Sequence, residues 1–257
     1  MKIQALMNKR SNFHNIEPLE DGSYEIPIYR FIPLKYLQDI LINKILKISQ
    51  TKSWDDTYEN FLGKVEFHVG ANKVSYQGFI YDFYGQCWTL KKESDALWRI
   101  YSHDKEGVRI KSTIQKLMNV ITYGNEILPK KTRANIIGKV EYHTEEKIKN
   151  WVLSLKNVDL VDMSKSLFIK RPEFQHEEEV RLIIHKFANQ EDDVRGIKRP
   201  FLNFEFNPFE TIDEITFDPR VTDEDFKRNK LILEKLGFKK KINQSNLYHF
   251  QPIERPL

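Results

Sequence analysis

The sequence predicts an α+β fold with a mixed, mostly antiparallel sheet and peripheral helices. Segments with the two-residue period of strands and segments with the 3.6-residue period of helices both occur along the 257 residues. They follow one another without the regular strand–helix alternation of a doubly wound parallel sheet. No linker rich in proline, glycine or serine divides the chain, so we predict one domain over residues 24–257 after a mobile lead-in over 1–23.

The elements can be assigned in chain order. A first strand is expected at 24–31, where Pro27 favours an edge position. Pro33 suits the first turn of a short amphipathic helix, and residues 45–49 return as a strand. Further strands are predicted at 65–69, 79–89, 107–111, 136–142, 180–185 and 214–217. Further helices are predicted at 94–102, 112–123, 145–155 and 222–236.

The helix at 222–236 has the clearest start and stop signals. Thr222 can cap its first turn, which is acidic, and Gly237 ends it. Its predicted apolar face consists of Leu231, Ile232 and Leu236.

Composition indicates a soluble protein. The 41 Lys+Arg residues nearly balance the 37 Asp+Glu residues, so the charge of +4 permits an anionic partner without requiring one. A single cysteine, Cys87, excludes an intramolecular disulfide and points to a reducing compartment. No apolar run is long enough for a membrane span or a secretory signal. We therefore expect a cytoplasmic protein without a membrane partner, and the oligomeric state stays open.

Several common catalytic motifs are missing from the sequence. It contains no glycine-rich phosphate loop, no G-x-S-x-G and no H-E-x-x-H. The seven histidines show no paired ligand spacing, so we predict no resident metal.

The most informative segment surrounds Glu177, Glu179 and Arg181. If residues 177–185 are extended, these three side chains share one face of a strand. The opposite face then carries Val180, Leu182 and Ile184. Carboxylates two residues apart repel each other, and such pairs occur where they act on a ligand, a metal or a cationic intermediate. The alternative is a solvated face on which Arg181 screens two glutamates.

Two aromatic segments are candidates for ligand binding. Arg30, next to Tyr29, can bind a phosphate or carboxylate with a ring beside it, or it is simply the outward residue of an alternating strand. Trp98 and Tyr101 share a helical face, which is either a stacking platform or part of the core.

Acidic residues also gather at 55–59. Asp55, Asp56 and Glu59 can either bind a divalent cation or form a capped turn. Cys87 is expected to be a small buried side chain.

Taken in order, these pieces resemble a bacterial family known as domain of unknown function 2971. The resemblance spans residues 26 to 250, and the family name carries no activity. Two departures occur: Trp54-Asp55-Asp56 stands where the family has Asn-Asp-Pro, and Phe174 and His176 replace Trp and Tyr. The matching pieces are Tyr29-Arg30-Phe31, Asp55-Asp56, Cys87-Trp88-Thr89, Leu97-Trp98-x-x-Tyr101, Val140-x-Tyr142, Lys170 to Arg181, Ile215 to Pro219, and Ser245.

The order of the residues also resembles ADP-ribosyltransferase-like folds more loosely. That resemblance implies that Arg30 binds the pyrophosphate of NAD and that Trp98 or Tyr101 stacks on nicotinamide or flanks the ribose. It implies that Glu179 stabilises positive charge at the anomeric carbon of the nicotinamide ribose and that Glu177 orients the acceptor. Tyr29 and Arg181 complete the implied NAD-binding set.

The resulting hypothesis is an NAD-consuming ADP-ribosyltransferase or NAD glycohydrolase of a bacterial toxin or phage-defence type. NAD is then a substrate, and the acceptor is a nucleic acid or a protein. This hypothesis predicts that Arg30, Trp98 and Glu179 lie in one pocket, with side chains roughly 10 Å apart or less.

Two alternatives remain open. One is a metal-dependent nuclease, and the other is a non-catalytic module that binds a nucleotide or nucleic acid through the Arg30 cleft. The nuclease would use Asp55, Asp56, Asp82, Glu177 and Glu179.

Overall fold

The structure, a computed structural model, describes residues 12–54, 56, 58–69, 72–123, 125–126, 133–156, 158–186 and 200–252. The chain forms two compact units whose segments alternate along the sequence. Unit 1 consists of Met1–Ile28, Ile45–Leu90 and Thr113–Phe206, and unit 2 of Tyr29–Lys44, Lys91–Ser112 and Asn207–Leu257. The single domain expected over 24–257 stays a prediction, and the lead-in expected over 1–23 lies partly outside the described residues.

Unit 1 is built on a largely antiparallel sheet. Its strands run in the order β1-β9-β12-β6, and β12 is antiparallel to both of its neighbours, while β1 is parallel to β9. β3 extends the sheet from β6 and pairs with β13, which pairs with β8. These strands are β1 (Asn12–His14), β3 (Ile45–Gln50), β6 (Phe83–Thr89), β8 (Asn125–Glu126), β9 (Arg133–Lys139), β12 (Glu179–Lys186) and β13 (Phe201–Glu205).

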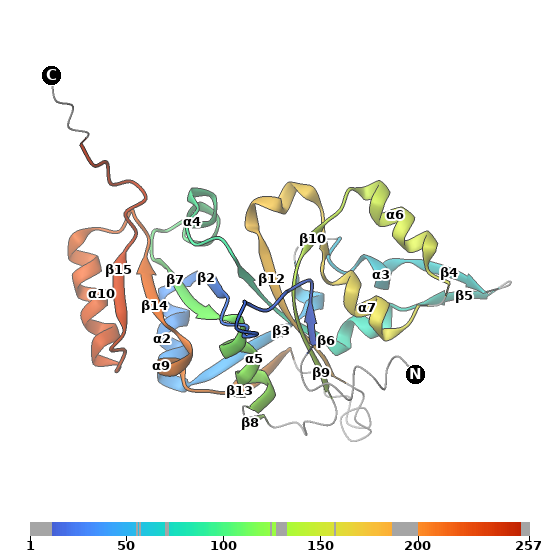
Figure 1. The fold of residues 1–257 in the computed structure, drawn as a ribbon, viewed down its shortest axis with the longest axis horizontal. Helices are drawn as coiled ribbons and strands as arrows, with labels where there is room; N and C mark the ends of the chain where they lie inside the picture. The colour runs from blue at the N-terminus through green and yellow to red at the C-terminus, as the bar shows by residue number, and fades with distance from the viewer. Residues whose placement is uncertain are drawn as a thin grey trace. The chain divides into compact units, whose positions relative to one another are not determined.

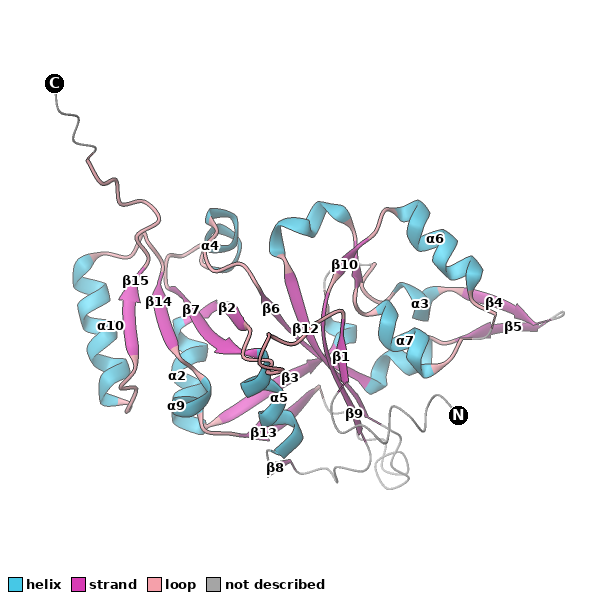
Figure 2. Ribbon diagram, viewed as in Figure 1, coloured by secondary structure: helices cyan, strands magenta, loops and turns pink. Residues whose placement is uncertain are grey.

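Short helices of unit 1 complete a hydrophobic core beside this sheet (Figure 2). Phe61 and Leu62 from α3, Ile148 from α6 and Met163 from α7 pack with Phe83 of β6. The helices are α3 (Phe61–Lys64), α5 (Ile114–Tyr123), α6 (Glu145–Ser154) and α7 (Leu160–Ser166), with 3₁₀ helices at Thr51–Ser53, Gln77–Asp82 and Pro172–Glu177. Two small pairs are β4 (Glu66–Val69) with β5 (Asn72–Ser75), antiparallel, and β10 (Glu141–Tyr142) with β11 (Ile169–Lys170), parallel.

The central strand β12 is buried on both faces, and this burial positions the candidate site. Val180, Leu182 and Ile184 are fully buried on one side, as predicted. Arg181 lies between Cys87 of β6 and Gly138 of β9 in the register. A side chain at Gly138 would collide with the neighbouring strand, because a Cβ there would lie 2.8 Å from the backbone oxygen of His14.

Unit 2 contains a second set of strands, in the order β2-β7-β14-β15 (Figure 1). β14 is antiparallel to β7 and parallel to β15. The ring of Phe226 in α10 packs edge-on against Phe217 of β14, with centroids 5.5 Å apart. The elements are β2 (Pro27–Pro33), α2 (Leu34–Asn43), α4 (Asp95–Tyr101), β7 (Gly107–Thr113), α9 (Pro208–Thr211), β14 (Glu214–Phe217), α10 (Asp223–Lys235) and β15 (Lys241–Gln244).

The predicted α+β class with a mostly antiparallel sheet is confirmed. The start of α10 is also confirmed, since the Thr222 hydroxyl accepts a hydrogen bond from the amide of Asp225. Its predicted apolar face is wrong: Leu231 and Ile232 are exposed, and Leu233 is buried. The contacts of α10 with the rest of unit 2 decide which side of the helix is buried, and the 3.6-residue period alone does not specify them.

Two other boundaries differ from the expectation. The strand predicted over 136–142 is divided into β9 and β10, which pair with different partners. The strand predicted over 79–89 begins only at Phe83, after a 3₁₀ helix. Among the described residues, no helix is sufficiently long and apolar to cross a membrane.

Candidate active site

Glu177 does not lie on the strand that was predicted to carry it. The 3₁₀ helix starting at Pro172 ends at Glu177, and Glu178 adopts a left-handed conformation with φ 42° before β12 begins at Glu179. This reversal, rather than the two-residue period of a strand, brings the side chains of Glu177 and Glu179 to a common partner. The expectation that Glu177 shares one face of an extended strand with Glu179 and Arg181 is wrong, although Lys170 contacts both glutamates.

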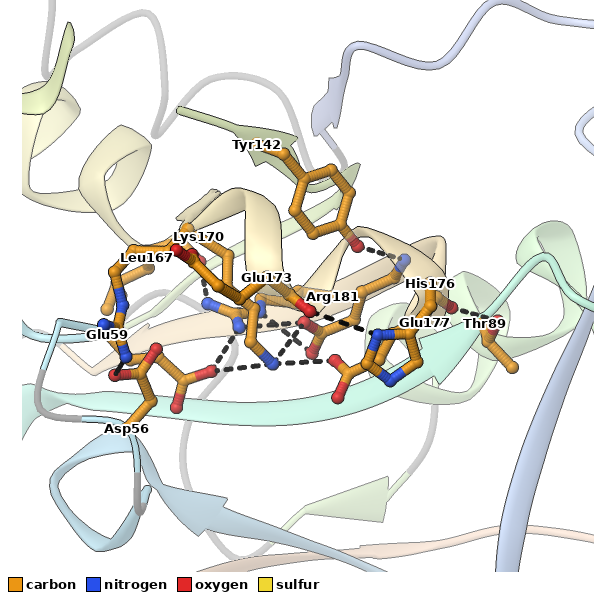
Figure 3. Close-up of polar contacts among 12 residues, drawn as sticks. Asp56, Glu59, Thr89, Tyr142, Leu167, Lys170, Glu173, His176, Glu177 and Arg181 are labelled. Atoms are coloured by element: carbon orange, nitrogen blue, oxygen red, sulfur yellow. Dashed lines mark hydrogen bonds and ion pairs between the residues drawn. The ribbon is translucent and has the colours of Figure 1, made fainter. Parts of the chain in front are cut away.

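Arg181 is the centre of a buried ion network (Figure 3). Its guanidinium donates from Nε to Glu179 Oε1 (3.0 Å) and from Nη2 to Glu179 Oε2 (2.9 Å), a two-point contact. Nη2 also donates to Glu59, and Nη1 donates to the Leu167 carbonyl (2.7 Å). The alternative of a solvated strand face is therefore wrong, because Arg181 is completely buried.

Lys170 joins the two glutamates of the motif. Its ammonium lies 2.7 Å from Glu177 Oε2, 3.4 Å from Glu179 Oε2 and 3.5 Å from Glu59 Oε1. The Lys170, Glu59 and Glu179 side chains are each at most 8% exposed. We call Glu59, Lys170, Glu177, Glu179 and Arg181 the carboxylate cluster.

The carboxylate cluster has three acidic and two basic side chains, which leaves one negative charge in excess. Burial alone raises the pKa of Glu179, but the charges and hydrogen bonds of Arg181 and the charge of Lys170 outweigh it, so this pKa is lowered. Glu59 shows the opposite balance: burial raises its pKa more than Arg181 and Lys170 lower it. Glu179 is therefore held ionised, and Glu59 takes up a proton more readily than Glu179 does.

Neighbouring groups shield this cluster from water. The Arg181 guanidinium lies 4.5 Å from the Trp54 ring centroid, and Lys170 Nζ lies 4.5 Å from the Phe174 ring centroid. The Tyr142 hydroxyl accepts a hydrogen bond from the amide of Glu179 (2.9 Å), and burial raises the pKa of Tyr142 to about 12. Burial also raises the pKa of the Cys87 thiol well above its usual value, so Cys87 stays protonated.

The carboxylate of Glu177 is bound through fewer oxygens than that of Glu179. Both oxygens of Glu179 are bound by Arg181 or Lys170. Among the described residues, Glu177 is bound only through Oε2, by Lys170, and its side chain is 12% exposed. Glu59 is likewise contacted only through Oε1 in the described part of the chain, but its side chain is 8% exposed against 12% for Glu177, so we infer that Oε1 of Glu177 is the oxygen more accessible to a ligand.

The acidic turn at 55–59 divides into separate roles. Asp56 Oδ1 accepts hydrogen bonds from the amide of Tyr58 (3.0 Å) and from Arg171 (3.2 Å), which favours the capped turn over a metal ligand. Asp55 lies outside the described residues. Within the described ranges, no group of three or more His, Cys, Asp or Glu side chains can hold a metal ion.

The other candidate residues belong to unit 2. Trp98 is completely buried, its indole N–H donates to Glu93, and its ring meets Phe31 edge-on at 4.7 Å. Tyr101, three residues later, is 43% exposed. The two rings therefore do not share an open face, and the core alternative is favoured for Trp98, while Tyr101 stays a prediction.

Tyr29 is buried and Arg30 half-buried on β2. The Tyr29 ring lies 5.2 Å from the guanidinium of Arg109, which is itself bound to Glu93 (3.1 Å) and Glu214 (2.9 Å). Arg30 and Glu179 belong to different units, so their predicted common pocket stays a prediction.

A polar cavity of about 310 Å³ lies in unit 2. Arg109, Thr216 and Asn243, which line it, are register partners across β7, β14 and β15. This row of polar side chains was missed in the sequence because each residue belongs to a separate strand.

Lys170 was missed as a functional candidate, and Glu59, which was considered only as a possible cation ligand, was not expected in the carboxylate cluster. Lys170 lies seven residues before Glu177. It begins the Lys170 to Arg181 stretch that resembles the domain of unknown function 2971 family, and this was the one indication in the sequence of a role for Lys170. Glu59 lies 122 residues before Arg181, and no local pattern links the two.

The opposite pKa shifts in the carboxylate cluster predict how stability depends on pH. Glu179, with a lowered pKa, contributes stability above its unfolded pKa near 4.5 that is lost as the pH falls through its folded value. Glu59, with a raised pKa, contributes stability below 4.5 that is lost as the pH rises through its folded value. We therefore expect Glu59→Gln to gain stability relative to wild type as the pH rises from 4.5 to 7.

Urea unfolding of both proteins across this pH range measures the difference. Burial lowers the pKa of His185 to about 4. This histidine affects the stability of both proteins alike, so its contribution cancels in the difference between them. A difference that is constant with pH, or of opposite sign, contradicts the assignment of the raised pKa to Glu59.

Comparison with known proteins gives one family match and several distant structural likenesses. A family model described as protein of unknown function (DUF2971) matches residues 97–182, which confirms the resemblance over this stretch. No curated protein matches the chain.

The structural likenesses are to DarT from Thermus sp. 2.9. DarT in complex with NAD⁺ is 11% identical, with a TM-score of 0.39, and the match covers 88% of this chain and 98% of DarT. DarT in complex with ADP-ribosylated single-stranded DNA is 12% identical, with a TM-score of 0.40, covering 92% of this chain and 100% of DarT. DarT in complex with carba-NAD⁺ is 11% identical, with a TM-score of 0.39 and coverage of 88% and 98%.

Proposed function

We propose that this protein cleaves the nicotinamide–ribose bond of NAD and transfers the ADP-ribosyl group to an acceptor or to water. The observation that supports the proposal most directly is the state of Glu177. Lys170 fixes one oxygen of its carboxylate, and the other is available beside a buried, ionised Glu179. The choice of NAD as the substrate also rests on the resemblance to ADP-ribosyltransferase-like folds. That resemblance is carried by the order of Arg30, Trp98 or Tyr101, and Glu177-x-Glu179 in the sequence.

The chemistry of the bond suits such a site. When the C–N bond between ribose and nicotinamide breaks, its electron pair leaves with the pyridinium nitrogen and gives neutral nicotinamide. Positive charge then develops at the anomeric carbon and its ring oxygen. Negative charge that is already in place stabilises this oxocarbenium-like state without reorganisation. The excess negative charge of the carboxylate cluster has the required sign.

Glu177 has a second task in the proposed reaction. The oxygen of water or of an acceptor hydroxyl attacks the anomeric carbon, and its proton must leave. Oε1 of Glu177 is the proposed proton acceptor, while Glu179 supplies fixed charge and holds Lys170 and Arg181. Arg30, Tyr29 and Tyr101 are the proposed contacts to the rest of NAD.

Glu177→Gln is expected to lower the rate of nicotinamide release by about 10²-fold or more, because the amide cannot accept the proton. Purified wild type and variant are incubated with NAD, and released nicotinamide is quantified with and without nucleic-acid or protein acceptors. Glu178→Gln is the matched control, since its exposed side chain is adjacent in sequence.

Equal nicotinamide release by wild type and Glu177→Gln would sink the proposal. A chelator distinguishes the nuclease alternative, because the proposed reaction needs no metal and nuclease activity would vanish. Lys170 and Arg181 already bind both oxygens of Glu179 and one oxygen each of Glu59 and Glu177, which opposes the nuclease alternative.

The proposal includes the toxin or phage-defence type of activity. Consumption of NAD or modification of nucleic acid harms a host cell, so expression of the wild type should slow bacterial growth. Glu177→Gln should relieve that effect at equal protein level.

A further inference from the structure

Lys170 is a buried lysine, and burying its ammonium group destabilises the fold unless carboxylates compensate the charge. Its side chain is 8% exposed, and Lys is almost never buried without a partner. Its backbone is fixed by the parallel pairing of Tyr142 with Lys170 and by a hydrogen bond from the His143 amide to the Lys170 carbonyl (2.8 Å). The 3₁₀ helix that follows then returns the chain so that Glu177 meets the ammonium of Lys170.

The ammonium of Lys170 contacts three carboxylates from separate parts of unit 1. Glu59 comes from the segment before α3, Glu177 from the end of the 3₁₀ helix, and Glu179 from the start of β12. Carboxylates this close repel one another, so without a cation they would separate or one would bind a proton.

Arg181 cannot replace Lys170 in this role. Its guanidinium is bound to Glu179, Glu59 and the Leu167 carbonyl, and no described contact joins it to Glu177. Within the described part of the chain, Lys170 is the cation that contacts Glu177.

We propose that Lys170 is a positioning residue of this site: its ammonium holds the Glu177 carboxylate beside Glu179 by one oxygen and leaves the other oxygen to act on the ligand. This inference deepens the proposed function and rests on it. Displacing a reacting group by about 1 Å can cost about 10²-fold in rate, so a residue that touches no substrate can still control the rate.

The variant Lys170→Met keeps a chain of similar length without the charge. In this variant, Arg181 is the cation left in the carboxylate cluster to offset the negative charges of Glu59, Glu177 and Glu179. The Tyr142 hydroxyl, which accepts from the Glu179 amide, adds no positive charge. We expect kcat for nicotinamide release to fall by about 10²-fold with KM nearly unchanged. The acid limb of the pH–rate profile should move to higher pH, since Glu177 then binds a proton more readily.

Lys165→Met is the matched control, because Lys165 is exposed on α7 of the same unit. A second readout does not depend on activity. The carboxyl carbon of Glu177 is followed by ¹³C NMR titration, with its signal assigned from the Glu177→Gln spectrum. The pKa of Glu177 should rise in Lys170→Met and stay unchanged in Lys165→Met.

The two failures are distinguishable. If wild type releases no nicotinamide but the Glu177 pKa rises in Lys170→Met, the proposed function is wrong and the placement of Glu177 by Lys170 still holds. An unchanged Glu177 pKa and an unchanged kcat in Lys170→Met would overturn the role of Lys170. If Lys170→Met does not fold, Lys170→Arg serves instead: it keeps the charge, so it should keep the Glu177 pKa but lower kcat, and wild-type kcat would overturn the inference.

Discussion

Replacing Arg181 with methionine is expected to lower the free energy of unfolding by about 3–5 kcal/mol. Arg181 is completely buried and provides two hydrogen bonds to Glu179, one to Glu59 and one to the Leu167 carbonyl. Without it, Glu59, Glu177 and Glu179 share the single positive charge of Lys170. An uncompensated buried charge is the reason for the large effect.

Urea unfolding of Arg181→Met at neutral pH measures the change. Arg99→Met is the control, since Arg99 pairs with Asp95 on the surface of α4 and should give no measurable loss. The loss in Arg181→Met should shrink at low pH, where the stranded carboxylates bind protons. An equal, small effect in both variants would contradict the buried network.

Replacing Trp98 with alanine is expected to cost about 3–5 kcal/mol of unfolding free energy. The ring is completely buried, meets Phe31 edge-on and donates from its indole nitrogen to Glu93. Truncation therefore removes a large apolar contact, leaves a cavity and removes the hydrogen bond that the Glu93 carboxylate accepts from the indole.

Tyr101→Ala is the matched control on the same helix, and its half-exposed ring should change stability by less than about 0.5 kcal/mol. Thermal or urea unfolding of both variants decides between the two interpretations of Trp98. A Trp98→Ala variant that is as stable as wild type but has lost affinity for NAD would contradict the assignment of Trp98 to the core. It would support the interpretation of Trp98 as a stacking platform.

The match between predicted and observed elements was closest where a local signal was strong. The strand at 214–217 and the cap at Thr222 agree with the structure, because two-residue alternation and a capping hydroxyl act within a few residues. The strand containing Glu179 was also predicted, with Val180 on its apolar face.

Prediction failed where a backbone reversal or a packing angle controlled the outcome. Glu178 adopts a left-handed conformation that ends the 3₁₀ helix and separates Glu177 from β12, and the Glu-x-Glu spacing does not reveal it. In α10, the buried residue is Leu233, because the packing of the whole helix decides which of several adjacent apolar residues faces inward.

The sequence by itself determined the α+β class, most element positions and the placement of Glu179 and Arg181 on one face of a strand. These follow from periods of two and 3.6 residues, which local chemistry sets. Only the tertiary structure decided that Glu59 and Lys170 join the cluster and that Glu177 keeps one oxygen available. The reason is physical: a side chain's direction depends on its own backbone, but its partners and its charge balance depend on other segments that folding brings into contact. Glu59, for example, lies 122 residues before its partner Arg181.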